Sequence, residues 1–365
     1  LRPPTYGDES TSTLLDLAKG AVLRGEQTLA SHFFGRVLEN DDRDLAATLG
    51  LAASQLMLGK GSTAEELAQR ALTIAPNNPD ARLILANIRI AQERYQEAMT
   101  YLREAITVDP SFSLGFSRLG TILTALGENA KAEPILLRAL ALNPTDTNAL
   151  NSIGNVALAN GDPKGATLHF ERAIAANPGW LQPRINLAKA FDHLDCPDDA
   201  IGALEDLLTQ DPRHLEAKAY LAGLLNRVGN FGRALHLLDD ILEAKPEHLE
   251  ALFLAGLIHL QGDQPDEAIE YLERAAALAP GSADVKLNLV AAYRSTKRLD
   301  KALTVARRAV KSSPDHAPTL NALGSILLDL MQHNEAAEMF RQATAIDPGF
   351  YIAHVNLATA LLAAQ

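Results

Sequence analysis

The fold is decided by stretches such as residues 113–146, SLGFSRLGTILTALGENAKAEPILLRALALNPTD. Its first half places Leu119 and Leu123 one helical turn apart in a run of apolar residues, and this run ends at Gly127. Its second half repeats the helical pattern and stops at Pro144. Because the residue before a proline is pushed out of the α region, the second helix ends there. The stretch therefore predicts two amphipathic helices joined by a turn.

The same pattern recurs along the chain with a fixed period of 34 residues. Prolines share this register at Pro76, Pro110, Pro144, Pro178, Pro212, Pro246, Pro280, Pro314 and Pro348. Alanines share it at Ala30, Ala64, Ala98, Ala132, Ala166, Ala200, Ala234, Ala268, Ala302 and Ala336. Two unrelated residue types in one register, without an insertion, cannot arise from composition. The chain is therefore a tandem repeat of helix pairs.

A third repeated position lies in the first helix of each pair and carries a small residue. It is glycine or alanine at Ala18, Ala52, Ala86, Gly120, Gly154, Ala188, Ala222, Gly256, Gly324 and Ala358. Only Val290 departs from this rule. Small side chains let the ridges of one helix enter the grooves of another, so we expect close packing within each pair. Replacing Ala166 or Ala234 by leucine should overpack the pair and cost about 1–3 kcal/mol.

These positions resemble the tetratricopeptide repeat family, whose pattern is matched in one unit by Leu119, Gly120, Ala132, Ala139 and Pro144. We expect an N-terminal extension at 1–10, ten repeat units over 11–350 and a lone first helix at 351–365. The units are 11–44, 45–78, 79–112, 113–146, 147–180, 181–214, 215–248, 249–282, 283–316 and 317–350. One departure from the family pattern is a polar fourth residue, found at Arg82, Arg184, Lys218 and Lys286.

The resemblance implies an all-α fold, a right-handed superhelical solenoid in which first helices line a concave groove. Stacked helix pairs contact only their neighbours, so the array is quasi-one-dimensional. Such a groove suits an extended or helical segment of a partner protein rather than a small substrate. We therefore expect a non-catalytic scaffold for protein–protein interaction.

Composition and motifs exclude several other classes of function. Lys and Arg total 33 against 45 Asp and Glu, and this net charge of −12 argues against nucleic-acid binding. No stretch reaches the roughly 18 consecutive apolar residues that a membrane-spanning helix needs, so direct membrane insertion is not expected. The chain contains no His-Glu-x-x-His, no phosphate-binding glycine loop and no Gly-x-Ser-x-Gly motif. We expect no catalytic site, no cofactor and no metal.

The cysteine and three repeated histidines carry little functional signal. Cys196 lies between Asp195 and Pro197, and an acidic neighbour disfavours the thiolate that a nucleophile requires. Histidines recur two residues after the closing proline, at His214, His248 and His316. Adjacent helices lie about 8–10 Å apart, too far for two of these rings to share one ion. We interpret them as solvated or packing residues rather than metal ligands.

Asparagines and cations on the first helices are the candidate partner-binding residues. The asparagines are Asn87, Asn151, Asn155, Asn186, Asn288 and Asn321, with Asn356 in the same register as Asn186 and Asn288. The cations are Arg118, Lys189, Arg227 and Arg294. Asparagine both donates and accepts, so a ladder of asparagines could hold a partner backbone whatever its sequence. The set resembles part of the asparagine ladder of protein O-GlcNAc transferases; the alternative is that these residues only cap or solvate helices.

A second known binding mode of the family is not expected here. Co-chaperone relatives grip a C-terminal carboxylate with a lysine and an asparagine four residues apart. The residues four before Asn87 and Asn155 are Leu83 and Asn151, so the lysine is absent.

The two ends of the chain leave the wider context open. The chain opens on Leu1, which we interpret as a trimmed or processed terminus, and it ends on a first helix with Leu361 and Leu362. Solenoids usually carry a polar cap. We therefore expect that the native polypeptide continues past Gln365, or that a second copy covers this face through self-association.

Three functions remain in competition. The alternative to the scaffold is the substrate-recognition arm of a larger enzyme of the bacterial glycosyltransferase or sulfotransferase type. A scaffold for polysaccharide or pilus export is also compatible with the sequence. The compartment is not determined; we favour the cytoplasm, with the periplasm or envelope as alternatives.

Overall fold

A computed structural model describes residues 10–365. The expected N-terminal extension, 1–10, lies outside the described residues except for Ser10. The described residues form 21 α-helices and contain no strand, so the prediction of an all-α repeat fold is confirmed. The chain divides into two compact units, Leu1–Cys196 and Pro197–Gln365.

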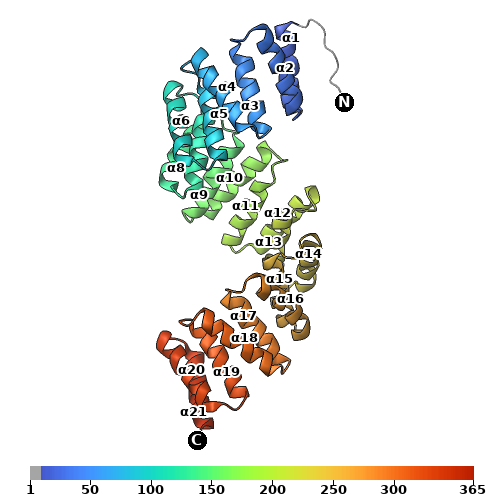
Figure 1. The fold of residues 1–365 in the computed structure, drawn as a ribbon, viewed down its shortest axis with the longest axis vertical. Helices are drawn as coiled ribbons and strands as arrows, with labels where there is room; N and C mark the ends of the chain where they lie inside the picture. Colours follow the sequence, from blue (N-terminus) through green and yellow to red (C-terminus); the bar gives the residue numbers. More distant parts are fainter. Residues whose placement is uncertain (1–9) are drawn as a thin grey trace. The chain divides into compact units, whose positions relative to one another are not determined.

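Within the first unit, the described helices alternate between first and second helices of the repeat (Figure 1). They are α1 (Thr11–Leu23), α2 (Gln27–Asn40), α3 (Leu45–Met57), α4 (Gly61–Ile74), α5 (Pro79–Ala91), α6 (Tyr95–Val108), α7 (Ser113–Ala125), α8 (Asn129–Leu142), α9 (Thr147–Ala159), α10 (Pro163–Ala176) and α11 (Gln182–His193). From α3 to α9, each first helix packs against the second helix that follows it and against the second helix before it.

The second unit is built in the same way. Its helices are α12 (Pro197–Gln210), α13 (Leu215–Arg227), α14 (Phe231–Ala244), α15 (Leu249–Gln261), α16 (Pro265–Leu278), α17 (Ala283–Ser295), α18 (Leu299–Ser312), α19 (Ala317–Asp329), α20 (His333–Ile346) and α21 (Tyr351–Ala363).

The turn between the two helices of a pair requires a left-handed residue. Five glycines adopt it, with φ between 74° and 78°: Gly25, Gly59, Gly127, Gly161 and Gly229. At the equivalent position of the other units, Glu93, Asp195, Asp263, Lys297 and Met331 also have positive φ, between 56° and 62°. The turn is therefore set by the repeat geometry even where the residue type opposes it, since a Cβ disfavours this region.

Close packing within a pair depends on the small residue of the first helix. A Cβ added at Gly120 would lie 2.4 Å from the side chain of Leu136, and one added at Gly154 would lie 2.5 Å from Phe170. The same holds for Gly256 against Leu272 and Gly324 against Phe340. The large residue that fills the space thus comes from the second helix, sixteen residues later, four residues past the repeated alanine.

The one exception to the small-residue rule has a partner of matching size. Sixteen residues after Val290 stands Ala306, whereas the other pairs carry leucine or phenylalanine there, except that Ala52 is followed by Ala68. Both side chains are buried, at 3% and 1% exposure, and belong to the same core cluster. The two positions therefore exchange sizes, and the volume between the helices stays filled.

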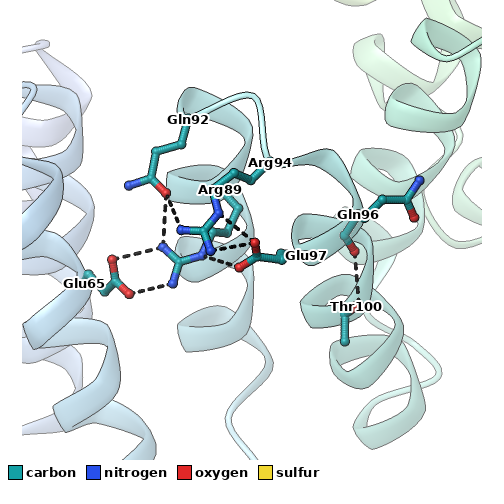
Figure 2. Close-up of polar contacts among 7 residues, drawn as sticks. All are labelled: Glu65, Arg89, Gln92, Arg94, Gln96, Glu97 and Thr100. Atoms are coloured by element: carbon teal, nitrogen blue, oxygen red, sulfur yellow. Dashed lines mark hydrogen bonds and ion pairs between the residues drawn. The ribbon is translucent and has the colours of Figure 1, made fainter.

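Successive pairs are also joined by charged side chains. Arg89 of α5 is buried, and its guanidinium donates two parallel hydrogen bonds to Glu65 of α4, at 3.0 and 2.6 Å (Figure 2). Its Nε lies 3.2 Å from a carboxylate oxygen of Glu97 on α6. One arginine thus joins three helices of two successive pairs. The hydrogen bond from Arg89 lowers the pKa of Glu65.

Candidate partner-binding surface

A row of polar side chains crosses four successive first helices of the first unit. It consists of Asn87 on α5, Thr121 on α7, Asn155 on α9 and Lys189 on α11, each 34 residues from the next. All four are half-buried, so part of each side chain faces solvent. We call these four residues the polar row. Three of them were expected from the sequence.

Thr121 was missed because it is not an asparagine or a cation. The signal that could have found it is its register, since it lies midway between Asn87 and Asn155 in the repeat. Its hydroxyl lies 3.0 Å from the hydroxyl of Ser152 on α9. It therefore also ties two first helices together.

Buried hydrogen bonds beneath the polar row hold the first helices in register. Asn186 Nδ2 on α11 donates to Asn151 Oδ1 on α9 at 2.9 Å. Ser117 on α7 donates to Asp146, the N-cap of α9, at 3.0 Å, and Asp146 also accepts from the backbone of Ala149. These bonds link α7 to α9 and α9 to α11, so Thr121, Asn155 and Lys189 are fixed relative to one another.

The pairing changes the role expected for two asparagines. Asn151 and Asn186 are 8% and 7% exposed and bond to each other. Burial and mutual bonding leave little of either amide for a partner backbone. By contrast, Asn87 and Asn155 make no hydrogen bond within residues 10–365, so their amides are open to a ligand.

Charges of both signs border the polar row. Arg118 on α7 is half-buried and makes no ion pair or hydrogen bond in the described part of the chain. Burial, and the nearby Asp109, raise the pKa of Asp80 at the start of α5. The surface therefore offers a cation and an acid beside the uncharged hydrogen-bonding groups.

In the second unit, most of the expected binding residues form hydrogen bonds to other residues of the same chain. Asn356 Nδ2 donates to Asn321 Oδ1 at 2.9 Å, and Asn288 donates to the carbonyl of Asp284 on its own helix. Arg294 donates twice to Asp329 on α19, at 2.5 and 3.0 Å. This contact raises the pKa of Arg294.

The remaining expected cation of the second unit is Arg227, which is exposed at the end of α13. The polar-row position of this unit holds Gly223, Leu257, Ala291, Ser325 and Thr359, so the row does not continue with amides or cations. The candidate surface is thus concentrated in the first unit.

The histidines and the cysteine take local roles. His214 and His248 are N-caps, and each Nδ1 accepts from the backbone of the third helical residue at 3.2 Å. His316 holds the same N-cap place on α19 without a side-chain bond. Cys196 Sγ contacts the carbonyl of Leu194 at 3.6 Å. Among the described residues no cluster of three potential metal ligands is present.

The last helix leaves an apolar surface. Leu357 packs against the core of the second unit, whereas Leu362 is 72% exposed. Self-association through this face stays a prediction. None of the helices described is both long and apolar enough to cross a membrane.

Comparison with known proteins establishes the family. Three sequence models, each described as tetratricopeptide repeat, match the chain: one at 15–79, 117–179 and 224–283, a second at 55–115 and 259–326, and a third at 317–350. The chain belongs to the tetratricopeptide repeat family, as the repeated leucine, small residue, alanine and proline indicated.

Solved structures support the same fold. A tetratricopeptide repeat protein from Parabacteroides merdae is similar with a TM-score of 0.51 and 17% identity, over 68% of this chain and 98% of that chain. PilF of Pseudomonas aeruginosa is similar with a TM-score of 0.50 and 20% identity, over 58% and 97% of the two chains. No curated protein matches the sequence.

Proposed function

We propose that this chain is a non-catalytic scaffold that binds an extended or helical segment of a partner protein along the first helices of its first unit. The observation that supports this proposal most directly is the polar row. Asn87 and Asn155 present amides that no other described residue uses, and the buried bonds between α7, α9 and α11 hold Asn155 in position. Preorganised hydrogen-bonding groups reduce the ordering cost of binding.

The spacing of the row fits a polypeptide. Packed helices lie about 8–10 Å apart, and an extended chain advances about 3.3 Å per residue. Successive rungs would therefore meet every third residue of an extended partner. Amides can bond to backbone groups at these points without selecting a side chain.

The charges select among such segments. Lys189 is itself a member of the row, Arg118 precedes Thr121 by three residues on α7, and Asp80 precedes Asn87 by seven residues on α5. We expect a polar partner segment that carries at least one acidic residue near α7, where Arg118 has no partner of its own.

The test uses site-specific photocrosslinking in the full chain. A benzophenone amino acid is placed at Asn87 or Asn155, and crosslinked polypeptides are identified from cells. The control positions are Gln96 and Leu168, which are exposed on second helices. We expect a polypeptide that crosslinks from the row positions and not from the controls.

A double variant, Asn87→Ala with Asn155→Ala, completes the test. It leaves the Asn151–Asn186 bond intact, so the helices keep their register. We expect crosslinking from a probe at Thr121 to fall sharply. The proposal is overturned if the double variant captures the same polypeptide as strongly as the original chain, or if all positions crosslink alike.

A further inference from the structure

Two positions of the repeat change together along the chain. Where the fourth residue of a unit is uncharged, the residue 22 positions later is arginine or glutamine: Arg36, Arg70, Arg138, Arg172, Arg274 and Gln342. Where the fourth residue is a cation, the later residue is an acid in three units: Arg82 with Glu104, Arg184 with Asp206, and Lys218 with Asp240. The unit 283–316 alone has cations at both positions, Lys286 and Arg308.

The structure gives the reason for the first combination. In three units the arginine of the second helix, Arg138, Arg172 or Arg274, donates to the carbonyl of the proline that closes the preceding unit. Arg172 reaches the Pro144 carbonyl at 3.2 Å, and Arg274 reaches the Pro246 carbonyl at 2.8 Å. When the fourth residue is uncharged, no second cation of the unit stands at that position beside this arginine.

In two units with the second combination, the cation forms an ion pair with a carboxylate of the same unit. Arg82 Nε lies 3.3 Å from Glu104 Oε2, and Lys218 forms an ion pair with Asp240. In both units the cation of the first helix therefore finds a carboxylate on the second helix of its own pair.

Neither arrangement exists around Lys286. This side chain is only 7% exposed, and its Nζ donates to the hydroxyl of Ser312 at 2.8 Å, with no carboxylate bound. Arg308 makes no hydrogen bond to the Pro280 carbonyl and no ion pair within residues 10–365. Lys311 has no ion-pair partner in the same part of the chain. Three cations therefore lack a counter-charge, and one of them is buried.

These cations line a pocket between α16, α17 and α18. Its volume is about 500 Å³, and its apolar wall is formed by Ala276, Ala277, Leu289 and Val305. The acid at its edge, Glu273, is already engaged, because it accepts from the hydroxyl of Tyr293 and lies 3.7 Å from Lys301. We call the site lined by Lys286, Arg308 and Lys311 the cation pocket.

We propose that the cation pocket binds an acidic side chain of a partner polypeptide, with an aliphatic neighbour of that residue against Leu289 and Val305. The carboxylate that Glu104 and Asp240 supply within their own units is supplied here by the partner. Charge-assisted hydrogen bonds to lysine and arginine are strong, and they strengthen where water is excluded. This site lies between the first helix α17 and the second helices α16 and α18, and it does not depend on the polar row.

The direct test is a titration of the full chain, labelled at leucine and valine methyl groups, followed by NMR. The probe is N-acetyl-leucyl-glutamate amide, and its matched control is N-acetyl-leucyl-glutamine amide. With the glutamate probe we expect saturable chemical-shift changes at Leu289 and Val305. The affinity for the glutamine probe should be lower by about tenfold or more.

Three variants test whether the glutamate probe binds at the cation pocket. Arg308→Glu supplies a carboxylate at the position of Glu104 and Asp240, so the probe should lose about tenfold or more in affinity while the melting temperature rises. Lys286→Met removes the buried cation and should also abolish binding. Arg307→Glu makes the same charge change on the adjacent residue, which pairs with Glu335 at 3.2 Å, and should retain binding.

The remaining outcomes contradict the proposal. Equal shifts with both probes would mean that apolar contact alone drives binding. Equal losses in Arg307→Glu and Arg308→Glu would indicate only general charge attraction. Acetate or inorganic phosphate that saturates the pocket as tightly as the glutamate probe would show a small-anion site and not a polypeptide site.

Discussion

Asn186 Nδ2 donates to Asn151 Oδ1 at 2.9 Å, and this bond joins first helices whose residues are 35 positions apart. The same contact, at the same separation and distance, joins Asn356 to Asn321. Side-chain amides at two adjacent repeat positions thus form hydrogen bonds between the first helices of successive pairs. Both amides of the first pair are buried, and Asn151 Oδ1 is the acceptor that the structure gives the Asn186 amide nitrogen.

Removing one amide of this pair should destabilise the fold. Asn151→Ala leaves the Asn186 amide buried without an acceptor, which costs about 1–3 kcal/mol. Urea unfolding of the two single variants and the double variant measures the coupling, and the double variant should cost less than the sum. Asn87→Ala is the control and should change stability by less than about 0.5 kcal/mol. Additive losses would mean that the bond contributes nothing.

Val290→Gly and Ala306→Leu should each destabilise the fold alone and should compensate for each other when combined. Ala306→Leu alone should overpack the pair and cost about 1–3 kcal/mol. Val290→Gly alone leaves a cavity and should cost about 2 kcal/mol. The double variant recreates the arrangement of Gly120 and Leu136, so it should recover part of the loss. Thermal unfolding of all three variants checks this, and a strictly additive double variant contradicts the size exchange.

The ion pair of Glu65 with Arg89 should make stability depend on acid pH. Because Arg89 lowers the pKa of Glu65, the folded state binds fewer protons than the unfolded state just below the ordinary value of 4.5. The stabilisation is therefore complete above about pH 4.5 and is lost as the pH falls through the folded pKa. Glu65→Gln should cost about 1 kcal/mol at pH 7, and less at pH values below the folded pKa.

Denaturant unfolding at several pH values measures this difference. Glu66→Gln is the control, since Glu66 is the exposed neighbour on the same helix and has no ion pair among the described residues. A loss in Glu65→Gln that stays constant with pH would show that packing, and not the charge, is responsible.

A glycine should stabilise the turn at Met331. This residue has φ of 62° and is 75% exposed, so its side chain adds strain but little packing. Met331→Gly should raise stability by about 1 kcal/mol, since a non-glycine residue in the left-handed region costs about 1–2 kcal/mol and glycine costs some entropy in the unfolded chain. The melting temperature reports the change. A lower melting temperature would show that Met331 contributes contacts that outweigh its strain.

The period, the two helices of each pair, the glycine turns and the family can all be read from the amino-acid sequence. These features depend on residues close together in the chain, such as Leu119 with Leu123, or on the exact return of Pro144 and its equivalents. The sequence also placed Asn87, Asn155 and Lys189 on first helices.

Which of these side chains are available to a partner depends instead on the packing of the helices. Asn151 bonds to Asn186, Val290 faces the helix of Ala306, and Lys286 lies beside Arg308 without a carboxylate. Each relation joins residues 16 to 35 positions apart on different helices. Each of these contacts depends on how one helix is rotated and shifted against another. The periodic pattern of a single helix does not specify that rotation or shift.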